Sequence, residues 1–280
     1  MKILRYLTYS LALMLMIASC EKHEIQYNTT PVTGAEFQLH YFVPVSSTAT
    51  AYAVDSVMLN GVQVSSVKGA GQLKPQGSIP GSGYTGRFFS VKAGETNIKF
   101  YKGGNVIYDQ NVTLTASKQN VIVHDLDKAP IVIDNQYPYQ HVSGIPNVTT
   151  WDTDSLQTVM FINLLYEKAG EPYKGKLQYQ WQHPTTKEWK DLGTPVGFGE
   201  ATERTEVRVI KTTHNSSGSC RIDYRILTED REVLQILNSG GKYVDYSDWW
   251  TGYIGRAYMH FYRGVRTEKG SSGVTNWTSL

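Results

Sequence analysis

The sequence has few cysteines and no long apolar run. Only two cysteines, Cys20 and Cys220, occur among its 280 residues. A disulfide framework of the kind that holds many small secreted domains together is therefore excluded. The N-terminal stretch Leu7 to Ile17 is apolar over about 11 residues, whereas a membrane-spanning helix needs about 20. No later segment is long and apolar enough to serve as one, so stability must come from ordinary burial of side chains.

The first twenty residues have the order of a secretory signal. Lys2 and Arg5 precede the stretch Leu7 to Ile17, and small residues follow in Ile17-Ala18-Ser19-Cys20. This ending closely resembles the bacterial lipobox. We therefore expect residues 1–19 to be a lipoprotein signal peptide and the mature chain to start at Cys20, with lipid on its sulfur and α-amine. Several acyl chains on one cysteine anchor a protein to a membrane without further help.

Removal of the signal leaves an electrically neutral chain. Lys2 and Arg5 leave with it, so 25 of the 27 basic residues remain against 25 acidic ones. Nucleic acid binding needs a basic surplus that releases phosphate counterions, and no Lys/Arg-rich run is present. We therefore expect no nucleic acid partner. With Cys20 lipidated, no intrachain disulfide can form, and we expect Cys220 to be a buried structural thiol.

The residue patterns that mark common enzymes and metal sites are missing. Seven histidines stand far apart in the sequence, and none has the short spacing by which one helix or loop holds a metal. No Gly-x-Ser-x-Gly elbow and no P-loop occurs. We expect no catalytic residue, no metal and no cofactor. A pair of carboxylates brought together by the fold would escape this search, so an enzyme of unknown class remains an alternative.

The first half reads as a series of short strands. Residues 20–33 are polar and without periodicity, which suits a tether. The alternating run Ala35 to Val43 predicts a half-buried strand. Asn60-Gly61 between two apolar runs predicts a β-hairpin. Glycine turns about ten residues apart indicate a β-sandwich over 34–134, interrupted by a long loop at Gly69 to Gly86.

The second half repeats this reading after a proline-rich boundary between 134 and 147. It opens with the apolar strand Thr158 to Tyr166, which is similar in position and character to the first strand. The segment Glu229 to Leu237 suits a strand or one to two turns of helix. We expect a second β-sandwich over 147–280. The fold class is therefore all-β, with two tandem β-sandwich domains of immunoglobulin-like or transthyretin-like type.

Two stretches together resemble a known family. They are the opening strand and the later segment from Val91 through Ala93-Gly94 to Tyr101, followed by Asn120-Val121-Ile122-Val123. This arrangement resembles the DUF4397 family of envelope β-sandwich domains, found in lipoproteins of Bacteroidetes-type bacteria. The start of the second half, Met160 to Leu165, resembles the same opening strand. The resemblance implies a fold and an envelope location but no activity, and it does not extend to the aromatic region from Tyr243 to Tyr262.

An aromatic segment near the C-terminus is the candidate binding site. It runs from Tyr243 to Tyr253 and includes Tyr246, Trp249, Trp250 and Tyr253, with Trp181 and Trp189 upstream. Sugar rings stack on indole and phenol rings, while nearby polar groups bond to their hydroxyls. Adjacent Trp249 and Trp250 cannot both face the core of an extended segment, so one of them should be exposed. The alternative is that these side chains fill the core or a seam between domains.

These observations predict a non-catalytic, lipid-anchored cell-envelope protein. We expect it to be an outer-membrane lipoprotein that faces the cell surface or the periplasm. Its expected role is that of a surface binding module, with glycan or an envelope protein as the candidate partner and with Tyr246, Trp249, Trp250 and Tyr253 as candidate ligand-binding residues. The alternatives are a structural or adhesive subunit of an envelope complex and, less in keeping with the residues, an enzyme.

Overall fold

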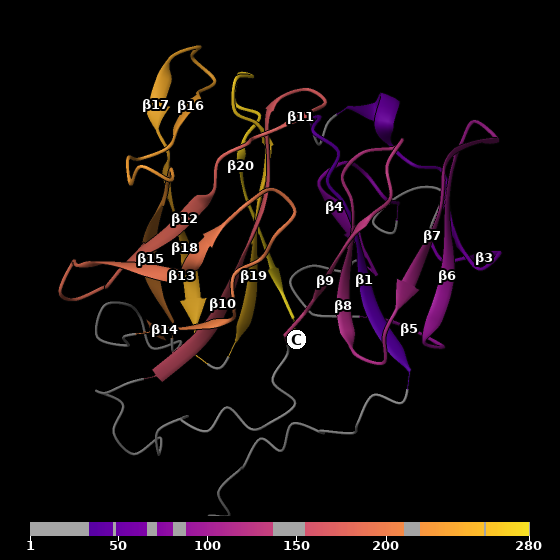
Figure 1. The fold of residues 1–280 in the computed structure, drawn as a ribbon, viewed down its shortest axis with the longest axis horizontal. Helices are drawn as coiled ribbons and strands as arrows, with labels where there is room; N and C mark the ends of the chain where they lie inside the picture. Colours follow the sequence, from indigo (N-terminus) through magenta and orange to yellow (C-terminus); the bar gives the residue numbers. More distant parts are fainter. Residues whose placement is uncertain are drawn as a thin grey trace, which may run out of the picture. The chain divides into compact units, whose positions relative to one another are not determined.

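In the computed structural model each half of the chain begins with a strand, β1 (Ala35–Tyr41) in the first half and β10 (Ser155–Lys168) in the second (Figure 1). The structure describes residues 34–46, 49–65, 72–80, 88–136, 155–209, 219–254 and 256–279. Within these residues the fold consists of strands and one short 3₁₀ helix, η1 (Thr50–Tyr52). The expected signal peptide, Cys20 and the tether lie outside the described residues.

The first half contains two sheets. Sheet I has the spatial order β4-β1-β8-β9, and β5 also pairs with β1; sheet II has the order β3-β2-β6-β7. Their remaining strands are β2 (Ser56–Leu59), β3 (Val62–Gln63), β4 (Gly77–Ile79), β5 (Phe89–Val91), β6 (Gly94–Lys102), β7 (Asn105–Leu114), β8 (Lys118–Val123) and β9 (Ile131–Asp134).

The second half also contains two sheets and one extra hairpin. Sheet III has the order β11-β10-β19-β20 with β14 paired to β10, sheet IV has the order β13-β12-β15-β18, and β16 pairs with β17. Their strands are β11 (Glu171–Pro172), β12 (Leu177–Gln182), β13 (Trp189–Val196), β14 (Thr205–Val209), β15 (Ser219–Leu227), β16 (Gln235–Leu237), β17 (Tyr243–Asp245), β18 (Ser247–Tyr253), β19 (Ala257–Val265) and β20 (Gly273–Thr278).

The two halves share one strand topology. In each half the opening strand pairs in parallel with a late strand, β1 with β8 and β10 with β19. That late strand then forms an antiparallel pair with the last one, β9 or β20. Sheets II and IV are antiparallel and both begin with a hairpin, β2–β3 or β12–β13. The similarity between the two opening strands that the sequence predicts is therefore confirmed by their equivalent places in the topology.

Three hydrophobic cores hold the sheets together. Sheets I and II enclose one core, which includes Phe37, Tyr41 and Phe100. Sheets III and IV enclose a second core rich in tyrosine. A third core joins sheet I to sheet III and contains Phe42, Ile122, Ile133, Met160, Ile162, Leu164, Met259 and Phe261.

The middle of the opening strand of the second half is apolar at consecutive positions because it is buried on both faces. Val159 and Phe161 contribute to the core between sheets III and IV, whereas the intervening Met160 and Ile162 contribute to the core shared with sheet I. Successive side chains of a strand point to opposite faces, so a strand covered on both sides favours runs of apolar residues without alternation.

The all-β sandwich class predicted from the sequence is confirmed, and so is the Asn60-Gly61 hairpin. Both turn residues have positive φ, 48° and 81°, which is the conformation of a two-residue hairpin turn. Glu229 to Leu237 ends in strand β16, so the helical alternative for those last residues is wrong. The expectation of a strand-free loop at Gly69 to Gly86 is also wrong, because β4 lies within it. The division into two domains at 134–147 stays a prediction.

Candidate functional site

Sheet IV has one buried face and one solvent-side face. On β15, Ile222 and Tyr224 point into the core, while Arg221, Asp223 and Arg225 alternate with them on the other side. The same alternation holds on the neighbouring strands. We name the solvent side the Trp–Arg face; it consists of Gln180, Gln182, Trp189, Asp191, Arg221, Asp223, Arg225, Trp249 and Thr251.

Two tryptophans lie in one row across this face. Trp189 on β13 pairs with Gln182 on β12, and Asp223 on β15 pairs with Trp249 on β18. Trp181 pairs with Tyr224, so the next pair in the antiparallel register places Gln182 beside Asp223. Trp189 and Trp249 are therefore three strand spacings apart, about 14 Å for neighbours roughly 4.8 Å apart.

Each of these tryptophans carries a stacked arginine. The Arg225 guanidinium carbon lies 4.3 Å from the Trp189 ring centroid, and that of Arg221 lies 4.7 Å from the centroid of Trp249. Such contacts are cation–π interactions. Trp249 nevertheless remains 48% exposed. The Trp–Arg face therefore presents aromatic rings and guanidinium groups side by side.

A hydrogen-bond chain along β13, β12 and β15 orders the polar part of the face. Arg231 donates to the carboxylate of Asp191 at 2.8 Å, and the Gln180 amide donates to the same carboxylate at 2.6 Å. The Gln180 oxygen then accepts the Nε–H of Arg225 at 2.9 Å. The bond from Arg231, together with the weaker effect of that from Gln180, lowers the pKa of Asp191 below its usual value.

The four aromatic residues that the sequence suggested for binding divide between the two faces. Trp249 lies on the Trp–Arg face, and Tyr253 has the same parity on β18, where Arg256 stacks on its ring at 4.3 Å. Trp250 and Tyr246 belong instead to the core between sheets III and IV. The expectation that only one of the adjacent tryptophans is exposed is confirmed.

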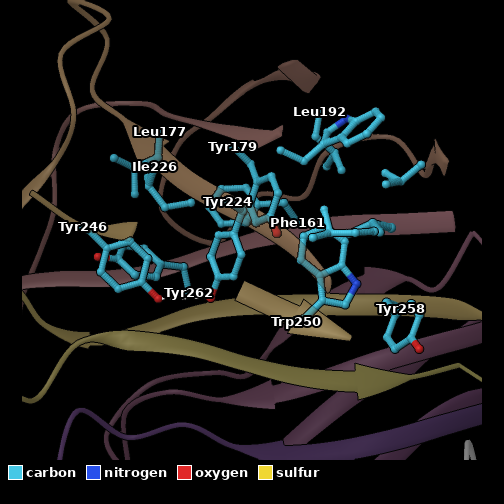
Figure 2. Close-up of a cluster of buried hydrophobic side chains, with 14 of the residues drawn as sticks. Phe161, Leu177, Tyr179, Leu192, Tyr224, Ile226, Tyr246, Trp250, Tyr258 and Tyr262 are labelled. Atoms are coloured by element: carbon cyan, nitrogen blue, oxygen red, sulfur yellow. Dashed lines mark hydrogen bonds between the residues drawn. The ribbon is translucent and has the colours of Figure 1, made fainter. Parts of the chain in front are cut away.

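The buried members of the segment form part of an aromatic cluster (Figure 2). Trp250 meets His260 edge-on, with ring centroids 4.8 Å apart, and also packs against Tyr179 and Tyr224. The Tyr246 hydroxyl accepts the Val274 N–H at 3.1 Å. Burial raises the pKa of Tyr246 to about 12, so its phenol stays neutral. These two side chains stabilise the fold and are not available on the surface.

Sequence reasoning missed the partners that complete the face. The sequence marks Trp189 only as an aromatic residue upstream of the candidate segment, and it does not distinguish Arg221 and Arg225 from other surface cations. Their alternation with Ile222 and Tyr224 is a readable signal that β15 has a solvent side. Their stacking on particular tryptophans follows from the register of four strands, which local sequence does not specify.

Comparison with known proteins adds no assignment. No family model matches this sequence, and no curated protein matches it. Within the described ranges no three metal-ligating side chains are grouped so that they could hold an ion. In the same part of the chain no helix is long and apolar enough to cross a membrane.

Proposed function

We propose that this protein is a non-catalytic, lipid-anchored envelope protein whose Trp–Arg face binds glycan. The observation that supports the ligand class most directly is the row that contains both Trp189 and Trp249 on the solvent side of one sheet. An extended saccharide lying along this row would meet an indole ring near each end. Gln182 and Asp223, between the two rings, offer hydrogen-bonding groups to sugar hydroxyls.

The rigid support of the face favours binding by a preformed surface. Trp249 stands on a strand whose next residue, Trp250, is anchored in the core at 3% exposure. The backbone of this strand, β18, also pairs with β15 from Ser247 to Tyr253. Little conformational freedom is therefore left to lose when a ligand binds, which increases the affinity of a modest contact area.

The ligand part of the proposal is tested with the full chain purified in detergent. Tryptophan fluorescence and affinity electrophoresis are measured with a panel of soluble polysaccharides, for the wild type and for Trp249→Ala. We expect at least one polysaccharide to retard the wild type and Trp249→Ala to bind it at least about tenfold more weakly. The matched control is Tyr243→Ala, which removes another exposed aromatic ring, on hairpin β16–β17.

Either of two results would overturn the ligand proposal. If no polysaccharide in the panel binds the folded wild type, or if Trp249→Ala and Tyr243→Ala bind equally well, the Trp–Arg face is not a glycan platform. A defined envelope protein that co-purifies with both variants would instead favour the structural or adhesive alternative.

The anchor is tested separately. Metabolic labelling with an alkyne fatty acid and fractionation of membranes should show label and membrane retention for the wild type and loss of both for Cys20→Ser. Cys220→Ser is the control, because this thiol is fully buried in the core between sheets III and IV. Membrane retention of a labelled Cys20→Ser protein would contradict the lipoprotein assignment.

A further inference from the structure

Two contacts fix the position of Arg225 on the Trp–Arg face. Its guanidinium stacks on Trp189 at 4.3 Å, and its Nε–H is bonded to Gln180 at 2.9 Å. Gln180 is itself 95% buried, and its amide orientation is fixed by the bond to Asp191. The side chain of Arg225 is therefore held from one side by a ring and from another by a hydrogen-bonded amide.

Arg225 also differs from its neighbours in charge balance. Arg221 forms an ion pair with Asp223 at 2.8 Å, and Arg231 forms one with Asp191 at 2.8 Å. Asp191 is close enough for Arg225 to lower its pKa as well, but its oxygens bond to Arg231 and Gln180. Within the described part of the chain no carboxylate forms an ion pair with Arg225, and no acceptor bonds to its two Nη groups.

A guanidinium with two adjacent N–H groups matches the geometry of a carboxylate or a sulfate, which it binds through two parallel hydrogen bonds. We infer that the Trp–Arg face recognises an acidic saccharide, with the anionic group of one sugar on Arg225 and a neighbouring ring stacked on Trp249. This inference rests on the proposed glycan function and specifies its ligand class. The shared chemistry is an anion carried by a sugar ring, whether a uronic or sialic carboxylate or a sulfate ester.

The experiment compares acidic polysaccharides with neutral counterparts that keep the same rings. The probes are polygalacturonate and polysialic acid, each beside its carboxyl-reduced form, and chondroitin sulfate beside a form that is both desulfated and carboxyl-reduced. Chondroitin that is only desulfated or only carboxyl-reduced shows which of the two anions is recognised. The full chain in detergent is measured by isothermal titration calorimetry. We expect at least one acidic probe to bind at least about tenfold more tightly than its neutral counterpart, as loss of a charge-assisted hydrogen bond implies.

Variants test whether Arg225 causes the preference for acidic over neutral polysaccharides. Arg225→Gln should reduce the acidic preference at least about fivefold, and Arg225→Lys should recover only part of it because a lysine lacks the two-pronged geometry. Lys92→Gln is the control, since it removes one exposed positive charge from the first half of the chain. Added salt should weaken the wild type more than Arg225→Gln.

Each outcome separates the two proposals. Binding of neutral glycans that needs Trp249 but is unchanged in Arg225→Gln overturns the acidic-ligand inference and leaves the glycan function in place. An acidic preference lost equally in Arg225→Gln and Lys92→Gln also overturns it, because net charge would then explain the effect. No binding by any acidic or neutral probe contradicts the glycan function itself.

Discussion

The guanidinium of Arg204 donates to both the backbone oxygen and the side-chain oxygen of Asn135, at 2.6 and 3.0 Å. Arg204 precedes β14 of the second half, and Asn135 follows β9 of the first. The same guanidinium also bonds to the backbone oxygens of Gln136 and Tyr258. One side chain thus binds chain segments from both halves.

We therefore expect Arg204→Gln to destabilise the protein by about 2–4 kcal/mol, because it leaves several buried acceptors without donors. The measurement is the free energy of unfolding in urea. Arg231→Gln, which breaks a solvent-exposed ion pair, should cost less than about 1 kcal/mol. Equal losses for the two variants would show that the Arg204 contacts contribute no more than a surface pair.

The adjacent tryptophans of β18 should differ strongly in their effect on stability. Trp250→Ala removes a ring from a tightly packed aromatic core and should cost about 3–5 kcal/mol. Trp249→Ala removes an exposed ring and its stack with Arg221, and should cost no more than about 1 kcal/mol. Thermal and urea unfolding of both variants check this. A large loss in Trp249→Ala would mean that its ring has a structural role.

Two fully buried histidines make stability depend on pH. Burial lowers the pKa of His40 to about 4 and that of His260 to about 3, while an unfolded histidine titrates near 6.5. As the pH falls below about 6.5 the unfolded chain takes up protons that the fold excludes. Stability is therefore lost progressively down to about pH 4 for His40 and pH 3 for His260. Between pH 7 and 5 the loss should be roughly 2 kcal/mol for each histidine.

The check is urea unfolding at pH 7, 6 and 5 with the variant His260→Phe. Phenylalanine suits the aromatic surroundings of this position but removes the hydrogen bond between the His260 Nδ1 and the Tyr179 hydroxyl at 2.9 Å, so the variant should be less stable at every pH and the slopes are what is compared. The slope of stability against pH should fall by up to about half. His124 and His183, whose pKa values are also lowered by burial, should account for part of the pH dependence that remains. An unchanged slope would show that His260 is protonated in the fold.

Gly252 should not tolerate a side chain. A Cβ at this position would collide with the buried amide of Gln157, whose Oε1 would lie 2.7 Å away. Gly252→Ala should therefore cost about 1–3 kcal/mol, and adding Gln157→Ala should recover part of that loss. Gly273→Ala is the matched control, because nothing lies within 4 Å of its added Cβ and its φ is ordinary. No difference between the two alanine variants in urea unfolding would contradict the packing described here.

Local sequence predicted the elements whose residues carry their own signals. The Asn60-Gly61 turn and the opposite orientation of Trp249 and Trp250 follow from turn chemistry and strand parity. The first strand was also predicted, but as half-buried, and this is wrong: Gln38 and His40 on its other face are as buried as Phe37, because sheet III covers that face. Strand β13 was missed because Asp191, Gly193 and Pro195 are poor strand formers, and its pairing with β12 maintains it. β4 was missed within a glycine-rich loop and is held by pairing with β1.

The candidate site was predicted only in part, for the same physical reason. Trp249 could be found from composition and parity within one segment. The placement of Arg225 over Trp189 spans an intervening strand, β12, and depends on two strand registers at once. Such cross-strand relations are set by tertiary packing, which a single sequence read segment by segment does not contain.

The parallel pairing of each opening strand has a consequence for how the chain reaches its native state. Phe37 faces Gln119, and Phe161 faces His260, so the partners are about 80 and about 100 residues apart, and contacts at such separations form slowly. Hairpins such as β2–β3 and β12–β13 can form early, and β10 can pair with β11 and β14, but the edge of β10 that pairs with β19 stays open until nearly the whole chain has been made. A chain that ends before Ala257–Val265 would leave one edge of β10 without its backbone partner and would expose apolar side chains of this strand. Such a chain should aggregate.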